Sequence, residues 1–245
     1  MKIDNKSFWE KNDIIATQEV LQNASDFELF LLEEAKKRFL HPIQKIKIFG
    51  CGTGREIYPI AEFFKPENIL ASDISENMIL KCRENLQKWG IDSLTNTRVA
   101  DAVQLNQPEQ AFELVTILNS MMTYVPEHAS RIQILKNAHQ LLVPGGQLIG
   151  TVHNQVGTPK KTLYFQLRSL LRPFLGVKVG NRMTGFNGFQ VPGYYYNSND
   201  LHKDLEKSGF TAVKIMSLEA FYQSKGMAYN RKTGYNNLIF IATKK

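Results

Sequence analysis

The chain has 245 residues, of which 43% are apolar and 22% charged, and this ordinary composition excludes wholesale disorder. Every apolar run is shorter than the roughly 18 residues of a membrane span, and MKIDNKSFWEKND at the N-terminus lacks the apolar core of a secretion signal. The net charge of +7 favours an anionic partner (nucleic acid, a phosphorylated substrate or a membrane surface), although general solubility explains it equally well.

Residues 1–42 are predicted to form a helical cap. From Ser7 to Leu40, apolar residues recur at three- and four-residue steps in two pieces, and Ser25 has the position of a helix cap for the second piece. Because this segment precedes the first strand, we expect it to pack over the open end of the sheet. Phe8 and Trp9 are then either lid residues over a ligand or ordinary packing at a helix start.

A glycine turn follows the first predicted strand. Lys45 to Gly54 reads KIKIFGCGTG, a short apolar strand that ends in three alternating glycines, and Arg55 to Phe64 has helical spacing behind it. Glycine tolerates positive φ and lets a ligand approach the backbone. A second strand, Asn68 to Ser72, ends on Asp73, 19 residues after the last glycine, where an acidic residue commonly holds a ribose hydroxyl pair. Only the arginine after the turn could counter a pyrophosphate, so the spacing favours a nucleoside without phosphates.

Strands and helices continue to alternate as far as residue 154. The next predicted elements are a helix from Ser75 to Trp89, strands from Thr95 to Ala100 and from Phe112 to Leu118, a helix from Glu127 to Leu142 and a strand from Gln147 to Val152. This alternation predicts an α/β fold with a doubly wound, mostly parallel sheet, whose ligands lie at the carboxyl ends of the strands. The residues expected at those ends are Gly50 to Gly54, Asp73, Asp101, Asn119, Ser120 and His153.

At these residues the chain resembles the class I S-adenosylmethionine-dependent methyltransferases. Five segments are similar to five motifs of that family, in order and spacing: FGCGTG (49–54), ASDISENM (71–78), VADAVQL (99–105), FELVTILNSMMTYVP (112–126) and LLVPGGQLIGTVHN (141–154). The resemblance implies a seven-stranded Rossmann-like sheet and S-adenosyl-L-methionine as cofactor. The family usually carries Asp or Glu two residues before the first glycine, where this chain has Ile48. Another group, from the N-terminal segment or a turn carbonyl, would then have to hold the methionine ammonium.

The resemblance also implies roles for individual residues. Asp73 is expected to accept both ribose hydroxyls, and Asp101 to meet the adenine amino group. The full set expected to bind the cofactor is Gly50, Cys51, Gly52, Thr53, Gly54, Asp73, Ile74, Asp101, Ala102, Asn119 and Ser120. No metal-ligand spacing is visible, and the two cysteines fit neither a disulfide framework nor a metal site, so we expect reduced residues in a cytoplasmic protein.

The alternation stops after His153. Residues 155–197 are predicted to be a substrate-covering insertion, with a helix from Lys160 to Leu171 followed by a stretch rich in glycine and aromatic residues. Residues 198–245 are expected to add a helix and two antiparallel strands, which completes a single domain over 1–245 whose cofactor half is 43–154. The residues expected to line the acceptor site are Trp9, Tyr194, Tyr195 and Tyr196.

Methyl transfer is an in-line displacement that needs no nucleophile from the protein, only a base where the acceptor must lose a proton. His153 is the candidate base, against the alternative of a structural histidine, and Tyr124 either orients the substrate or packs. The leading hypothesis is methylation of an O or N of a small molecule, such as a natural product or a sugar. The alternatives are an RNA methyltransferase, favoured by the charge but not by NSMMTY (119–124), and a donor-binding protein without catalysis. We expect a small-molecule acceptor as partner, no membrane partner and no nucleic acid, and the sequence leaves the oligomeric state open.

Overall fold

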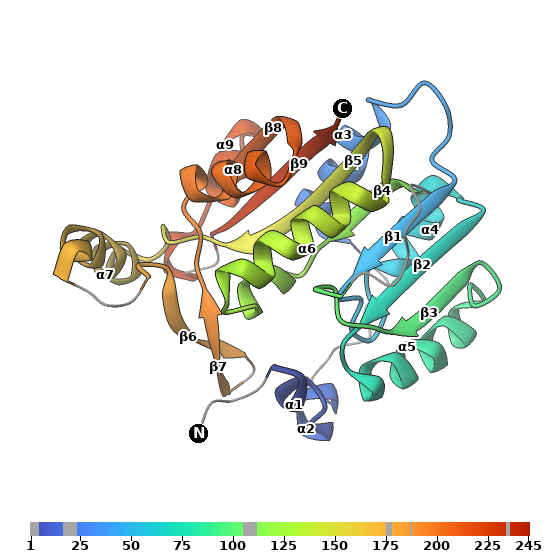
Figure 1. Ribbon diagram of the computed structural model, residues 1–245, viewed down its shortest axis with the longest axis horizontal. Coiled ribbons are helices and arrows are strands. Elements are labelled where there is room, and N and C mark those ends of the chain that lie inside the picture. Colours follow the sequence, from blue (N-terminus) through green and yellow to red (C-terminus); the bar gives the residue numbers. More distant parts are fainter. Residues whose placement is uncertain (1–4, 17–23, 105–111, 175–177, 187, 234–235) are drawn as a thin grey trace.

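The computed structural model describes residues 5–16, 24–104, 112–174, 178–186, 188–233 and 236–245. Within these residues, seven strands form one sheet in the order β3-β2-β1-β4-β5-β9-β8, and β6 and β7 pair separately (Figure 1). The strands are β1 (Lys45–Phe49), β2 (Asn68–Asp73), β3 (Thr95–Val99), β4 (Phe112–Ile117), β5 (Leu142–His153), β6 (Asn181–Phe186), β7 (Phe189–Tyr194), β8 (Phe210–Ser217) and β9 (Asn237–Lys244).

Strands β1 to β5 pair in parallel, whereas β9 is antiparallel to both β5 and β8. In β1, Ile46 pairs with Ile69 on one side and with Leu114 on the other, and all three side chains are fully buried. Such strands are apolar on both faces because helices cover both faces of the sheet. The predicted fold, a doubly wound and mostly parallel seven-stranded sheet, is confirmed.

Two hydrophobic cores lie on the two faces of the sheet, and each contains its own helices. Helices α3, α4, α5 and α9 contribute to the core around Ile48, and α6 and α8 to the core around Val115. The helices are α1 (Asn5–Trp9), α2 (Asn12–Ala16), α3 (Asp26–Lys36), α4 (Ile57–Phe64), α5 (Glu76–Trp89), α6 (His128–Leu141), α7 (Pro159–Leu170), α8 (Ser198–Lys207) and α9 (Leu218–Ser224), with 3-10 turns η1 (Met121–Tyr124), η2 (Arg172–Phe174) and η3 (Arg231–Thr233).

The helix caps show how local sequence sets these boundaries. Ser75 Oγ accepts a hydrogen bond from the N–H of Met78 and so begins α5, and Gly90, at φ 69°, ends it. Helix α8 begins at Ser198 because the side chain of Asn197 caps it and accepts a hydrogen bond from the N–H of Asp200.

Three segments differ from the sequence-based prediction. The N-terminal cap forms three helices in the described residues rather than two pieces. The strand predicted from Gln147 to Val152 begins earlier, at Leu142, so that β5 is twelve residues long. The glycine- and aromatic-rich stretch folds into the β6–β7 hairpin, with Asn181 opposite Tyr194.

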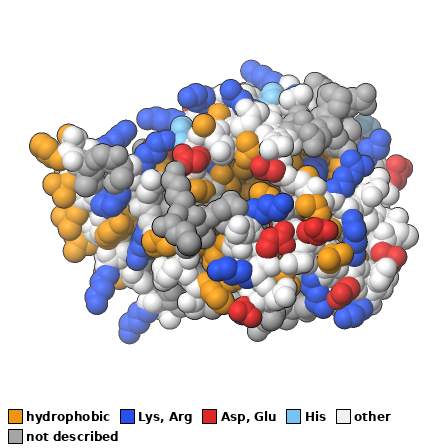
Figure 2. Space-filling model, turned by 60° about the horizontal axis from the view of Figure 1, so that its bottom comes forward, with side chains coloured by type: hydrophobic (Ala, Val, Ile, Leu, Met, Phe, Trp, Pro, Cys, Tyr) orange, Lys and Arg blue, Asp and Glu red, His pale blue; other side chains and the backbone are white. Residues whose placement is uncertain are grey.

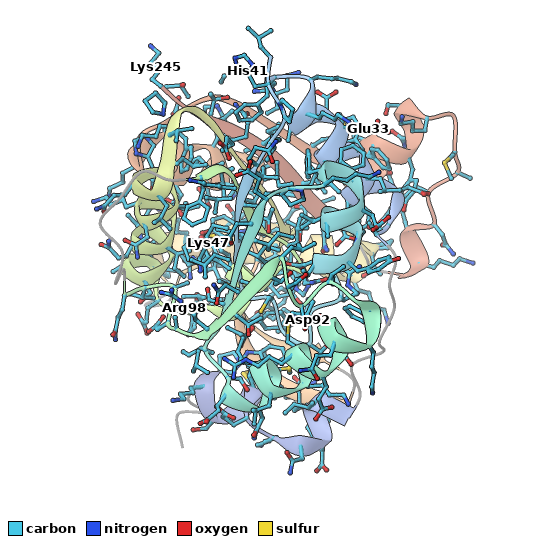
Figure 3. All side chains as sticks on the ribbon, turned by 90° about the vertical axis from the view of Figure 1, so that its right-hand side faces the viewer. Glu33, His41, Lys47, Asp92, Arg98 and Lys245 are labelled. Atoms are coloured by element: carbon cyan, nitrogen blue, oxygen red, sulfur yellow. The ribbon has the colours of Figure 1, made fainter. Side chains whose placement is uncertain are left out.

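The strand ends that matter for function face the N-terminal helices. Viewed from the β3 edge, His41 and Lys245 lie at one end of the molecule, and α1 and α2 lie at the opposite end (Figure 3). The arrowheads of β1, β2 and β5 point toward the end that carries α1, α2 and the β6–β7 hairpin (Figure 1). The carboxyl ends of the parallel strands are therefore enclosed by two segments that lie far apart in the sequence.

Candidate functional site

The glycine turn after β1 is held open by its backbone. Gly50, Gly52 and Gly54 all have positive φ, at 69°, 51° and 94°. A Cβ on Gly50 would lie 2.5 Å from Cγ of Met121, so this position has no room for a side chain. A Cβ on Gly52 would meet nothing within 4 Å, so open space lies in front of this glycine. The turn therefore presents bare backbone to whatever lies at the strand ends.

Asp73 fixes this turn from the end of β2. Its Oδ2 accepts a hydrogen bond from the N–H of Gly52 at 2.9 Å, and its Oδ1 accepts from the N–H of Ser75 at 3.0 Å. Burial raises the pKa of Asp73, while the backbone donors oppose that shift. Each carboxylate oxygen keeps lone pairs for a further donor, such as a hydroxyl group.

The other predicted cofactor residues lie around the same strand ends. Asp101 follows β3, and its Oδ1 accepts from the N–H of Val103 at 2.9 Å. The carbonyl of Ala102 accepts from Asn137 at 2.8 Å, and Ile74 is half-buried beside Asp73. The structure thus brings the predicted donor side together at the ends of β1, β2, β3 and β4.

Cys51 and Thr53 point away from that opening. Both side chains are buried, and the Thr53 carbonyl accepts from Asn85 in α5 at 2.9 Å. A hydrogen bond with Cys82 and burial raise the pKa of the Cys51 thiol well above its ordinary value. Only the backbone of these two residues is therefore available to a ligand.

Asn119 and Ser120, directly after β4, are consecutive non-glycine residues with positive φ, at 53° and 55°. L-residues adopt this conformation at a cost, and it persists where the surroundings impose it. The Ser120 N–H donates to Thr151 at 2.8 Å, and Ser120 Oγ accepts from Asn237 at 3.1 Å. The strained turn directs the Asn119 side chain toward α4.

A group of four polar side chains joins Asn119 to the glycine turn, and the sequence did not predict two of them. Asn119 donates to Oε2 of Glu56 and accepts from Arg55, both at 2.5 Å. Arg55 also pairs with the buried Glu28 of α3. Glu56 is 2% exposed, and its Oε1 has no hydrogen-bond partner in the described part of the chain. Burial raises the pKa of Glu56 to about 8.

On the acceptor side, aromatic rings from four segments form a continuous row. Successive ring centroids are 5.1 Å apart from Trp9 to Tyr124, 5.8 Å from Tyr124 to His153, 5.2 Å from His153 to Tyr195 and 5.4 Å from Tyr195 to Phe165. We call these five residues the aromatic row. It passes directly across the end of β5 and links the N-terminal cap to the insertion.

His153 lies at the centre of this row. Its backbone N–H donates to Thr123 Oγ1 at 2.9 Å, and its Nδ1 is buried with no hydrogen-bond partner among the described residues. Burial, with a contribution from the Lys161 ammonium, lowers the pKa of His153 to about 4. The imidazole is therefore neutral at neutral pH, and one ring nitrogen is able to accept a proton.

Of the three predicted acceptor tyrosines, the structure places only Tyr195 beside His153. Side chains alternate along an extended segment, so Tyr194 and Tyr196 point to the opposite side. There, the Tyr194 ring lies 3.7 Å from the Arg131 guanidinium carbon, and the fully buried Tyr196 accepts from Arg131 and donates to Asp204. We therefore withdraw Tyr194 and Tyr196 as acceptor contacts and assign them to the core.

The N-terminal cap is attached to the donor side. Both carboxylate oxygens of Glu10 accept from backbone N–H groups at the start of α5, Glu76 at 2.8 Å and Asn77 at 3.3 Å. The carbonyl of Trp9 accepts from Ser75 Oγ at 3.1 Å. A carboxylate at a helix N-terminus is favourable. Trp9 thus lies where the donor side and the acceptor side meet, as a lid residue would.

A glycine turn after β1, an aspartate at the end of β2 and a second aspartate two residues after β3 are features typical of α/β proteins that bind a nucleoside at the carboxyl ends of their strands. A methyltransferase-domain family model matches residues 48–146, the stretch that contains these features. The first four predicted motifs begin within that stretch, and the fifth begins in it and continues to the end of β5. Residues 48–146 are therefore similar to a methyltransferase domain, and the predicted resemblance to S-adenosylmethionine-dependent methyltransferases and the predicted cofactor are confirmed.

Individual relatives are distant. The chain is 30% identical over 115 residues to carboxy-S-adenosyl-L-methionine synthase of Shewanella pealeana, a match that covers 46% of each chain. It is 25% identical over 157 residues to the ubiquinone/menaquinone biosynthesis C-methyltransferase UbiE of Hydrogenovibrio crunogenus, with 64% of this chain and 56% of that protein covered. The matches thus span about half the length of these relatives.

Structural similarity covers more of the chain. The structure of an S-adenosylmethionine-dependent methyltransferase from Methanosarcina mazei superposes with a TM-score of 0.64 at 18% identity, covering 85% of this chain and 96% of that one. This likeness supports the fold alone.

Proposed function

We propose that the protein transfers a methyl group from S-adenosylmethionine to an O or N atom of a small molecule held against the aromatic row. The observation that carries the proposal is the position of His153. This half-buried, neutral base lies at the end of β5, between the strand ends proposed to bind the nucleoside and a wall of rings. When bound, S-adenosylmethionine supplies an electrophilic methyl group on a sulfonium, so the protein has to position the acceptor, remove its proton and exclude water.

The residues on the donor side fit this cofactor. Asp73 and Asp101 offer acceptors for the ribose hydroxyls and the adenine amino group, and the open space at Gly52 admits a ligand to the backbone. Oε1 of Glu56 lacks a partner and belongs to the group that joins the ends of β1 and β4. We assign to Glu56 the role that Ile48 cannot fill, which is to accept a hydrogen bond from the methionine ammonium.

On the acceptor side, the residues have two tasks, which are to remove a proton from the acceptor and to exclude water. His153 takes the proton from the acceptor as the new bond forms, since its neutral ring has a free lone pair. Tyr124 and Tyr195 flank its ring, and Trp9 lies beyond Tyr124, so that apolar surface keeps water from competing for that proton. This arrangement requires no residue of the protein to act as a nucleophile.

Two alternatives make different predictions. The UbiE relative is by its name a C-methyltransferase, and a carbon acceptor is an outcome that product analysis distinguishes from O or N. The non-catalytic alternative was motivated by Ile48, and Glu56 removes that motive by supplying a carboxylate nearby. The RNA alternative was motivated by the basic charge of the chain. Most of that net charge lies in the insertion, between residues 155 and 199.

The test uses binding and transfer separately. Calorimetry should show that the chain binds S-adenosylmethionine and S-adenosylhomocysteine, and labelled methyl groups should enter a compound in a small-molecule extract. RNA added in excess should not reduce that transfer. Absence of binding to either ligand overturns the assignment, and binding without transfer to extract or RNA favours the non-catalytic alternative.

A further inference from the structure

Helix α7 exposes an apolar stripe that the described chain does not cover. Five large apolar residues recur at intervals of four, three, one and three positions and lie on one side of α7 and η2: Leu163, Leu167, Leu170, Leu171 and Phe174. This spacing is the period of one helix face. Leu170 is 75% exposed and Phe174 is 86% exposed, whereas the buried side chain of α7 is Phe165. Large apolar side chains grouped in this way mark an interaction surface.

The helix is well formed and held in place despite this exposure. Thr158 caps its N-terminus by accepting from the N–H of Lys161, and Arg168 donates to the carbonyls of Lys178 and Val179, both at 3.1 Å. In Figure 1, α7 projects from one end of the molecule, away from the large sheet. Figure 2 shows hydrophobic side chains gathered at that same end, with Lys and Arg side chains around them.

The charge of this segment is entirely positive. Between residues 155 and 199 the sequence contains no Asp or Glu, and its basic residues are Lys160, Lys161, Arg168, Arg172, Lys178 and Arg182. Most of the net charge of +7 is thus concentrated in the segment that carries the apolar stripe. An exposed apolar face flanked by lysine and arginine is the pattern of helices that lie in the interface of an anionic membrane.

We propose that α7 docks the protein on the surface of an anionic lipid bilayer, with its apolar stripe in the headgroup region and the exposed basic residues of the segment against the lipid phosphates. These exposed residues are Lys160, Arg172, Lys178 and Arg182. Among the helices that the structure describes, none is long and apolar enough to cross a bilayer. Contact with the bilayer is therefore interfacial. This proposal revises the expectation from the sequence that the protein has no membrane partner.

The positive charge and the exposed leucines together favour an anionic bilayer over the two other possible partners of this surface, a second copy of the chain and a nucleic acid. A second copy of the chain, packed stripe to stripe about a two-fold axis, would place the basic residues of both copies against each other. Nucleic acid would complement the charge but would leave the leucines exposed to water. An anionic bilayer complements both, because headgroups attract the cations and the acyl boundary takes the leucines.

Docking through α7 also places the acceptor side near the lipid. Phe165, on the buried side of α7, contacts Tyr195 of the aromatic row. The ammonium of Lys161 lies 5.6 Å from the centre of the same ring. The helix that meets the bilayer therefore also packs directly against the site.

Flotation with vesicles tests the proposal without reference to catalysis. The full chain should float with vesicles of phosphatidylcholine and phosphatidylglycerol but not with phosphatidylcholine alone, and high salt should release it. The double variant L170S/F174S should reduce the bound fraction at least about tenfold, because burial of large apolar side chains drives insertion. Both residues are exposed, so circular dichroism and melting should match the wild type.

Two exposed leucines elsewhere provide a matched control. Leu40 is 98% exposed and Leu80 is 50% exposed, and neither belongs to α7, so L40S/L80S should float like the wild type. Failure of the wild type to bind anionic vesicles overturns the proposal, as does equal binding by L170S/F174S. Light scattering that shows a dimer disrupted by L170S/F174S, with no vesicle binding, identifies a second copy as the occupant instead. None of these outcomes depends on methyl transfer, so failure here leaves the proposed function standing.

Discussion

The donor side and the acceptor side of the site are built by different forces. On the donor side, backbone N–H groups and carboxylates within hydrogen-bonding distance set the geometry, as where Asp73 accepts from Gly52 and Ser75. On the acceptor side, rings meet at centroid distances of 5.1 to 5.8 Å, and hydrogen bonds play a smaller part. Hydrogen bonds require particular partners and angles, whereas ring contacts tolerate variation.

This contrast implies that the two sides fail in different ways. A substitution on the donor side should weaken donor binding whatever the acceptor is. A substitution on the acceptor side should leave donor affinity unchanged and reduce transfer. Four variants test this separation, and two of them need no acceptor at all.

The largest effect is expected from Asp73→Ala. The variant removes the carboxylate proposed for the ribose hydroxyls, and hydrogen bonds to charged groups contribute about 1.5–3 kcal/mol each, so the Kd for S-adenosylhomocysteine should rise about 100-fold or more. Titration calorimetry measures this change. Asp92→Ala is the matched control, because Asp92 is exposed in the turn after α5 (Figure 3) and should leave Kd unchanged. An Asp73→Ala protein that melts like the wild type and binds equally well would rule out the ribose role.

His153→Gln tests the acceptor side. The variant keeps a polar side chain but removes the base, so kcat should fall about 100-fold, within the usual range for general bases. The Kd for S-adenosylhomocysteine should stay within about twofold, since His153 contacts rings rather than the donor turn. A fall in donor affinity as large as that in kcat would break the separation between the two sides. An unchanged kcat would make His153 structural.

The sequence predicted the fold around the donor side well because its signals are local. Only one helix and one strand, α4 and β2, lie between the glycine turn and Asp73, and the spacing of apolar residues predicted both elements. The sheet topology then followed from the alternation of strands and helices. The role of each residue at the strand ends remains a prediction, which the variants above address.

The acceptor side depends on contacts between distant segments, which one sequence does not display. Trp9 and Tyr195 belong to one row of rings although 186 positions separate them. The tyrosine run was predicted to line the site as a block, but alternation along an extended chain turns Tyr194 and Tyr196 into the core. Glu56 was missed because its significance comes from Asn119, which is distant in the sequence but follows the neighbouring strand β4. An acidic residue two positions after the last glycine of the turn was the signal available in the sequence.

Glu56→Gln gives a pH-dependent effect on the donor side. Its folded-state pKa of about 8 exceeds the ordinary value of 4.5, so the folded protein holds a proton that the unfolded chain releases. The stability that this group contributes is therefore fully present below about pH 4.5 and is lost as pH rises to about 8. Glu56→Gln imitates the protonated form, so its melting temperature should exceed that of the wild type at pH 8 and match it at pH 4.5.

The same variant should change how the donor binds. An ammonium beside Glu56 favours the ionised carboxylate, so binding of S-adenosylhomocysteine at pH 7 should release a proton in the wild type and none from this group in Glu56→Gln. Calorimetry in buffers of different ionisation enthalpy measures how many protons are released. The Kd of Glu56→Gln for S-adenosylhomocysteine should be about tenfold higher than that of the wild type. Glu62→Gln, on the exposed face of α4, should release the same proton as the wild type. Equal proton release from all three proteins would contradict the ammonium role.

The smallest effect is expected from Trp9→Ala, at the junction between the two sides. Aromatic pairs contribute about 0.5–1.5 kcal/mol beyond area burial, so losing the contact with Tyr124 should raise the acceptor KM by about 3- to 10-fold. Donor affinity should barely change, because the bond from Ser75 goes to the Trp9 carbonyl and the Glu10 contacts remain. Trp9→Phe should restore most of the acceptor KM, since a ring edge can still meet Tyr124. If Trp9→Ala weakened donor and acceptor equally, the N-terminal cap would act as one lid over both, and the separation of the site into two sides would end at Trp9.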